Sequence, residues 1–316
     1  MKKLVATIAL ALLSSAAHAQ YPNKPIRLIV PFPPGGAAEV GARIFAQPLG
    51  QALGQPVVIE TKPGADGAIA ADAAMKAAPD GYTLFYATNT AFSWVPSVRK
   101  DAPYDPVNDF TPVSMVGVFG FFLFSHPSVP AANMKELLAH MRANPGKLNY
   151  GSGNSTSIVS TAQLLQREKL QAVHVPYKGD GPLMVDLLGG RVHFAIATPG
   201  AAAPQVREGK LRALATLLPS RSPLLPDAPT MKESGLSELS VTPWGAVFGP
   251  KGMPRDVTER VSRELVALLK RPEVREAFGK LAFEPRGSTP EELAAFTKEQ
   301  LAVWRRAIAD AGIKPE

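Results

Sequence analysis

The chain of 316 residues contains no cysteine. Disulfide bonds, cysteine nucleophiles, thiolate metal sites and a lipid anchor on an N-terminal cysteine are therefore excluded. The few histidines show no H-E-x-x-H or paired metal spacing, and no loop ends in the Gly-Lys-Ser/Thr of a phosphate-binding P-loop. No serine lies in a G-x-S-x-G motif. We therefore predict no metal site, no cofactor and no catalytic residue.

Long apolar runs are also missing, apart from one short run at the N-terminus. There Lys2 and Lys3 precede the apolar stretch 4–13, which is followed by small residues and the tripeptide Ala17-His18-Ala19. A charged start, a short apolar run and an A-x-A site are typical of a secretory signal peptide, so we expect residues 1–19 to be removed. The alternative, a membrane anchor, requires about 18 or more apolar residues.

A strong charge of either sign is absent as well. The formal charge of +7 falls by the two charges of Lys2 and Lys3 when the signal peptide is cleaved. The remaining basic residues are scattered and form no run typical of a nucleic-acid surface, so we predict no nucleic-acid partner. The mild positive charge is compatible with attraction of anionic ligands and equally with general solubility.

Strand and helix patterns alternate along the rest of the chain. The apolar run 26–30 precedes a helical pattern, and the strand patterns 57–60 and 82–87 follow. A second set of strands and helices begins near residue 121, and a terminal helical segment starts at the predicted N-cap Thr289. Such alternation predicts an α/β fold with parallel sheets in two lobes. The pattern alone leaves open whether the chain crosses between the lobes once or twice.

Two strand-to-helix loops stand out as candidate ligand sites. Residues 31–36 read Pro-Phe-Pro-Pro-Gly-Gly, and residues 151–157 read Gly-Ser-Gly-Asn-Ser-Thr-Ser. Each precedes a helix, whose first N–H groups and positive dipole end favour an anion such as a carboxylate. Either loop alone could be an ordinary turn of a parallel sheet. Because ligands of open α/β sheets bind at the carboxyl ends of the strands, the two loops together favour a binding cleft.

Several motifs in the same order resemble one receptor family over essentially the whole mature chain. The segments that resemble the family are Tyr21–Ile26, Val30–Gly36, Pro63-Gly64-Ala65, Pro79–Leu84, Tyr104-Asp105-Pro106, Asp109–Val113, Asn144–Ser152, His174–Gly179, Pro226–Thr230 and Trp244-Gly245. The chain is similar in these segments to Bug-type extracytoplasmic solute receptors of tripartite tricarboxylate transporters. It departs from the family pattern at Glu39, where Asp is usual, and in the stretch 155–161.

The resemblance implies a two-lobed periplasmic-binding fold of type II. Each lobe is then a mixed, mostly parallel sheet flanked by helices, and the ligand cleft lies between the lobes. It also implies that the chain crosses the hinge twice. We therefore expect residues 20–121 and 243–316 to form lobe 1, and residues 122–242 to form lobe 2.

The resemblance further implies that the two loops grip a ligand carboxylate through backbone amides and waters. On this sequence the first loop corresponds to 32–38 and the second to 152–156. The residues predicted to bind the ligand are Phe32, Gly35, Gly36, Ala37, Ala38, Glu39, Thr88, Thr90, Ser152, Gly153, Asn154, Ser155, Thr156 and Thr198.

The function implied is that of a periplasmic solute-binding receptor, which is not an enzyme. It captures a di- or tricarboxylate, an aromatic acid or an acidic amino acid, and delivers it to the permease subunits of the transporter. A monomer is expected. The alternative is a receptor that presents its ligand to a periplasmic sensor. A secreted hydrolase would need a nucleophile and base within hydrogen-bond reach, for which the sequence has no motif.

Overall fold

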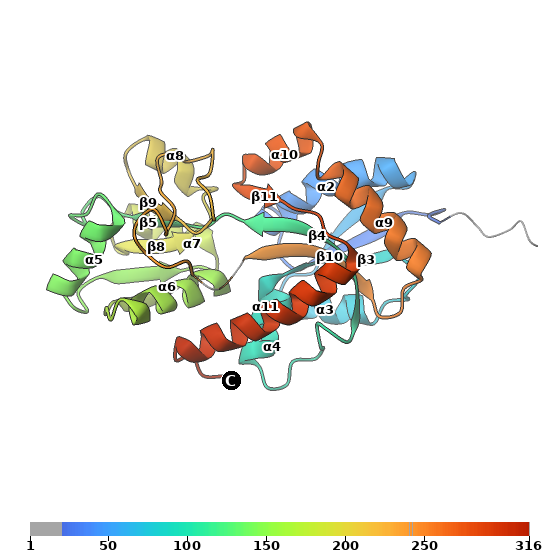
Figure 1. Ribbon diagram of the computed structural model, residues 1–316, viewed down its shortest axis with the longest axis horizontal. Coiled ribbons are helices and arrows are strands. Elements are labelled where there is room, and N and C mark those ends of the chain that lie inside the picture. Colours follow the sequence, from blue (N-terminus) through green and yellow to red (C-terminus); the bar gives the residue numbers. More distant parts are fainter. Residues whose placement is uncertain (1–20, 240, 242, 316) are drawn as a thin grey trace, which may run out of the picture.

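The computed structural model describes residues 21–239, 241 and 243–315, so the predicted signal peptide lies outside the described residues. Two β-sheets, each with its own helices, lie side by side (Figure 1). We call them the six-stranded half and the five-stranded half. Two mixed sheets flanked by helices agree with the predicted fold class. No helix in the described ranges is both long and apolar enough to cross a membrane.

The six-stranded sheet has the order β11-β4-β10-β3-β1-β2. Strand β1 is parallel to β2 and β3, whereas β10 is antiparallel to β3 and β4. Every side chain of β3 is buried, as expected for a strand covered by helices on both faces. The strands are β1 (Ile26–Val30), β2 (Val57–Thr61), β3 (Thr83–Thr88), β4 (Phe110–Phe119), β10 (Trp244–Pro250) and β11 (Phe283–Pro285).

Helices cover both faces of this sheet. One face packs on α2, α9 and α10, and the other on α3, the π-helical turn η2, α4 and the start of α11. The predicted cap of α11 is confirmed, because Glu292 N–H donates to Thr289 Oγ1 at 3.2 Å and Thr289 N–H to Glu292 Oε2 at 2.9 Å. The elements are α2 (Ala37–Leu53), η1 (Ala65–Gly67), α3 (Ala68–Met75), η2 (Thr90–Trp94), α4 (Val95–Val98), α9 (Arg255–Leu268), α10 (Pro272–Gly279) and α11 (Pro290–Asp310).

The five-stranded sheet has the order β7-β6-β8-β5-β9. Strands β7, β6 and β8 are parallel, and β5 is antiparallel to β8 and β9. Helices α5 and α6 pack on one apolar cluster, and α7 and α8 on another. The elements are β5 (Phe122–Ser125), α5 (Met134–Ala143), β6 (Asn149–Ser152), α6 (Ser155–Arg167), β7 (Val173–Pro176), α7 (Asp180–Leu188), β8 (Phe194–Ala197), α8 (Ala202–Arg207) and β9 (Arg212–Thr216).

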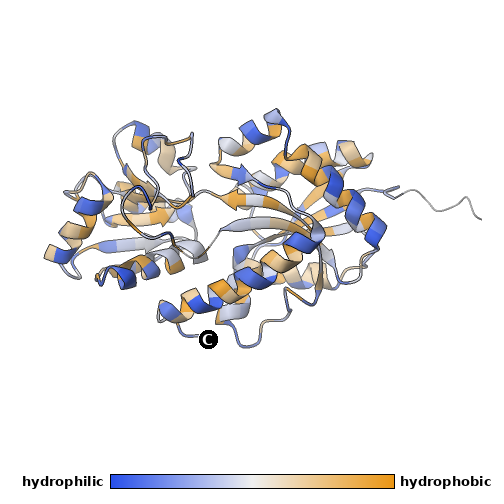
Figure 2. Ribbon diagram, viewed as in Figure 1, coloured by the Kyte–Doolittle hydropathy of each residue, from blue (hydrophilic) through white to orange (hydrophobic). Residues whose placement is uncertain are grey.

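The chain passes between the two sheets twice. It leaves the six-stranded sheet between β4 and β5, and it returns between β9 and β10. Apolar residues concentrate on the strands, while hydrophilic residues recur along α9 and α11 (Figure 2). Helix α11 also reaches the other half, since its Trp304 and Ile308 share an apolar cluster with Val159 of α6.

Candidate functional site

The first predicted loop connects β1 to α2 at the carboxyl end of β1. Gly36 is the N-cap of α2, and Gly35 has the positive φ of 83° that glycine adopts without strain. The N–H groups of Ala37 and Ala38 have no acceptor among the described residues. They therefore remain available as hydrogen-bond donors at the positive end of the helix dipole.

The side chain of Glu39 binds to the first loop itself. Its side chain is buried, with 2% exposure, and Oε2 accepts a hydrogen bond from Gly35 N–H at 3.0 Å. The other carboxylate oxygen forms an ion pair with Arg43, one turn further along α2. The amide of Gly35 is thus already engaged, and the charge of Glu39 is matched by a cation. We conclude that Glu39 holds the first loop in place.

The end of β3 lies at the same sheet edge as the first loop, because β1 and β3 are adjacent parallel strands. Thr88 is buried there, and its hydroxyl has no hydrogen-bond partner in the described part of the chain. Asn89 and Thr90 follow and lead into η2. Single π-helical turns are frequent at functional sites.

The second predicted loop connects β6 to α6. Asn154 caps the helix, with Ser157 N–H donating to its Oδ1 at 3.0 Å and Ser157 Oγ accepting from Asn154 N–H at 3.2 Å. The N–H groups of Ser155 and Thr156 meet no acceptor within the described ranges. This loop therefore also presents free donors at a helix N-terminus.

The polar side chains beside the second loop are already paired. The hydroxyl of Ser152 lies 2.6 Å from Nε2 of His174, and the partial burial of His174 lowers its pKa by disfavouring the charged imidazolium. Asn154 Nδ2 donates to Asp180 Oδ1 at 2.9 Å, and Thr198 donates to Asp180 Oδ2 from its N–H at 3.0 Å and its hydroxyl at 2.6 Å. These side chains hold the loops in shape, and the N–H groups of Ser155 and Thr156 remain as unpaired donors within the described part of the second loop.

Two side-chain hydrogen bonds join the halves of the molecule at this place. Asn89 Nδ2 donates to Thr156 Oγ1 at 3.1 Å, and the hydroxyls of Thr90 and Ser155 lie 2.9 Å apart. Asn89, Thr156 and Ser155 are each at least 95% buried. The end of β3 thus meets the N-terminus of α6 directly. We call these two bonds the junction pairs.

The structure does not join the two predicted loops to each other. Among the described residues, no hydrogen bond or ion pair links 32–39 with 152–156. Phe32 packs against the core of the six-stranded half. Among the described residues, the second loop is hydrogen-bonded instead to the end of β3, the strand adjacent to β1. The predicted site residues therefore fall into two groups, those at the junction and those beside it.

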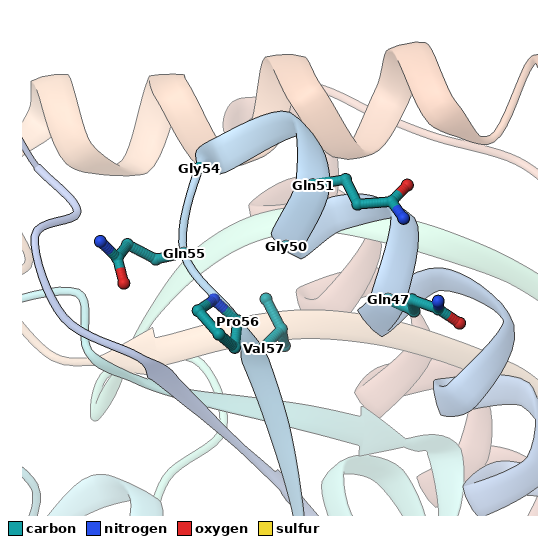
Figure 3. A pocket seen from close by; sticks show the side chains of 7 residues that line it. All are labelled: Gln47, Gly50, Gln51, Gly54, Gln55, Pro56 and Val57. Carbon is teal, nitrogen blue, oxygen red and sulfur yellow. The ribbon is translucent and has the colours of Figure 1, made fainter.

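Two open surface hollows lie elsewhere. One, of about 490 Å³, is lined by Gln47, Gln51, Gln55 and their neighbours at the far end of α2 (Figure 3). A helix of 17 residues is about 25 Å long, which separates this hollow from the first loop. The other, of about 650 Å³, lies between α9 and the start of α11. Neither hollow includes a predicted site residue.

Sequence reasoning missed three residues of this region, namely Asn89, His174 and Asp180. Asn89 lies between the predicted residues Thr88 and Thr90, so its position was a usable signal. Asp180 follows the end of β7 and begins α7, which is also a carboxyl-edge position. His174 lies close to its partner Ser152 because β6 pairs with β7. The sequence contains no local signal for this pairing of strands.

Comparison with known proteins identifies the family. Residues 41–313 match the family described as "Tripartite tricarboxylate transporter family receptor". The chain belongs to this family. The receptor is 36% identical to Protein BugT of Bordetella pertussis strain Tohama I, over 99% of both chains. The predicted resemblance to Bug-type receptors is confirmed, and so is the prediction that the protein is not an enzyme, because the family consists of receptors.

Solved structures of similar proteins share the fold of the receptor. The structure described as "R. palustris Rpa4515 with adipate" is 30% identical, with a TM-score of 0.85, and the match covers 94% of this chain and all of that one. MatC (Rpa3494) from Rhodopseudomonas palustris, with bound malate, is 29% identical, with a TM-score of 0.78, and 91% of this chain and all of that one are covered. These neighbours confirm the two-sheet binding-protein fold.

Proposed function

We propose that the receptor captures a small carboxylate in the periplasm, between two lobes that close on each other. Residues 20–121 and 243–316 act as one lobe and residues 122–242 as the other. The proposal depends most on the junction pairs, which hold the N-terminus of α6 against the end of β3. Adipate and malate in the related structures are small carboxylates, which supports the same ligand class here.

The ligand carboxylate is held by backbone N–H groups at the two helix N-termini. A buried carboxylate is costly unless it is well hydrogen-bonded, and the free amides of Ala37, Ala38, Ser155 and Thr156 supply such donors. The unpartnered hydroxyl of Thr88 lies at the same sheet edge and adds a further donor. Closure shields these bonds from water and strengthens them.

A calorimetric screen of the purified mature protein tests the ligand class. The panel contains dicarboxylates, tricarboxylates, aromatic acids, acidic amino acids and neutral sugars of similar size. We expect at least one carboxylate to bind and no sugar to bind, since the available donors lie at the positive ends of helix dipoles. Binding of a sugar without binding of any acid would reject the proposed ligand class.

We also propose that the loaded receptor delivers its ligand to the permease subunits of a tripartite tricarboxylate transporter. The support is membership of the receptor family of these transporters. Deletion of the gene is expected to abolish uptake of the ligand identified by calorimetry. Normal uptake, combined with loss of ligand-induced transcription, would instead favour a receptor for a periplasmic sensor.

The junction pairs predict the effect of removing one hydroxyl. Thr156→Val leaves Asn89 Nδ2 without its acceptor in a buried contact that forms only when the lobes meet. A net hydrogen bond contributes about 0.5–1.5 kcal/mol, so we expect ligand affinity to fall roughly 2- to 10-fold. Small-angle X-ray scattering should show a larger radius of gyration for the unliganded variant.

Thr161→Val is the matched control for this variant. Thr161 lies on the same helix and is fully buried, but its hydroxyl has no hydrogen-bond partner among the described residues. The same substitution there removes no bond, so affinity and radius of gyration should stay at the wild-type values. Equal behaviour of the two variants would show that the bond between Asn89 and Thr156 does not support closure.

A further inference from the structure

Three loops of the five-stranded half meet at one carboxylate. Asp180 begins α7, after β7, and accepts hydrogen bonds from Asn154 in the loop after β6 and from Thr198 after β8. The contact with the second loop is close, because a side chain at Gly153 would collide with Asp180 Oδ1. Asp180 therefore lies directly beside the proposed carboxylate site.

The charge of Asp180 is not matched by a cation. All three of its donors are neutral, and within the described ranges no Lys, Arg or His nitrogen lies within 4.0 Å of its carboxylate. Glu39 in the first loop differs, because it pairs with Arg43. Asp180 therefore places a negative charge without an ion-pair partner beside the second loop, whose own backbone donors favour one anion.

The carboxylate of Asp180 also retains acceptor capacity. A carboxylate offers about four lone-pair positions, and the three donors from Asn154 and Thr198 occupy three of them. A hydroxyl or ammonium group of a ligand could take the remaining position. A second ligand carboxylate could not, because like charges in a partly desolvated site repel each other.

We propose that Asp180 is a specificity-determining residue that selects ligands with one carboxylate and a hydroxyl or ammonium group over di- and tricarboxylates. This inference rests on the proposed function, since it presumes a carboxylate held at the helix N-termini. It narrows the ligand class to hydroxy acids and zwitterionic amino acids. The charge of Asp180 repels a second ligand carboxylate, and its remaining acceptor position receives a hydrogen bond from the hydroxyl or ammonium group of the ligand.

Matched pairs of ligands of equal chain length test the inference by calorimetry. The pairs are succinate with γ-aminobutyrate, glutarate with δ-aminovalerate, and adipate with ε-aminocaproate, with γ-hydroxybutyrate as the neutral-ended comparison. We expect the wild-type receptor to bind the amino or hydroxy acid about tenfold or more tightly than the paired dicarboxylate. In Asp180→Asn the ratio of the affinity for the amino or hydroxy acid to that for the paired dicarboxylate should fall about tenfold. The reason is that the substitution removes the charge of Asp180 and keeps its shape.

Asp227→Asn is the control for net charge, since Asp227 is an exposed residue of the same half. It should leave the preference unchanged. The inference is overturned if a dicarboxylate binds the wild type as tightly as its amino partner, or if Asp180→Asn leaves the ratio unchanged. Should Asp180→Asn not fold, the wild-type ratios decide alone. Failure of every acid tested, including citrate and benzoate, to bind the wild type would contradict the proposed function itself.

Discussion

Gly153→Ala is expected to weaken binding of the carboxylate roughly 5- to 150-fold. A Cβ at Gly153 would lie 2.5 Å from Asp180 Oδ1, 2.6 Å from the carbonyl carbon of Gly179 and 2.7 Å from Asp180 N. Two of these atoms are backbone and cannot rotate away, so the second loop has to move. Overpacking of this kind costs about 1–3 kcal/mol, and the affinity range is that cost expressed as a fold-change.

The movement would disturb the geometry on which the proposed site depends. The bond from Asn154 to Asp180 and the orientation of the first N–H groups of α6 are both set by this loop. Isothermal titration with the ligand found in the screen measures the loss. Chemical denaturation separates it from global destabilisation, which should not exceed the same 1–3 kcal/mol.

Gly181→Ala provides the matched control. Gly181 directly follows Asp180, in the first turn of α7, and a Cβ there meets no atom within 4 Å. Alanine is favoured over glycine in a helix by about 0.5–1 kcal/mol, so this variant should be as stable as the wild type or slightly more stable, with unchanged affinity. If Gly153→Ala bound the ligand as tightly as Gly181→Ala, the second loop would not belong to the site.

The sequence was sufficient to predict the two loops because their signals are local. Buried parallel strands appear as continuous apolar runs, and a glycine-bearing turn before a helical pattern marks the carboxyl edge. Strand β1 has the predicted bounds, 26–30, and β3 lies within one residue of the predicted strand 82–87 at each end. The strand pattern at 147–150 likewise predicts β6 to within two residues at each end. The loops at the carboxyl ends of β1 and β6 follow directly from these strands.

Long-range pairing was not predictable in the same way. Strand β4 was missed, because Pro112 and Gly117 interrupt its apolar pattern and resemble turn signals. It is a strand since β10 and β11 pair with it from residues more than 120 positions away. The partners of Ser152 and Thr156 were missed for the same reason, as each is brought near by tertiary structure.

The same distinction between local signals and long-range contacts applies to the individual side chains of the site. Their proximity to the strand ends was predictable, but their availability was not. Ser155 and Thr198 were predicted to bind the ligand, and the structure pairs the hydroxyls of both with other side chains. Which donors remain free depends on these tertiary hydrogen bonds. The assignment of ligand contacts to backbone amides therefore remains a proposal that the Gly153 variant tests.

Trp304→Ala is expected to lower the free energy of unfolding by about 3–5 kcal/mol, the usual cost of removing a large buried aromatic side chain. Trp304 is fully buried in α11 and shares its apolar cluster with Val98 of α4 and Val159 of α6. The cluster therefore includes residues from both proposed lobes. Because Val159 lies one turn from Thr156, the same substitution should also weaken the contact that closes the junction, and ligand affinity should fall with stability.

Phe248→Ala separates the loss of stability from the loss of ligand affinity. Phe248 is 1% exposed, and its aromatic contacts, Phe92 and Trp244, lie within the six-stranded half. Both variants should show a similar loss in chemical denaturation, because both leave a large cavity. At a temperature where both are folded, only Trp304→Ala should lower ligand affinity and enlarge the unliganded radius of gyration. Equal affinities would show that α11 supports the fold of one half alone, and that closure depends on the junction pairs and the bound ligand.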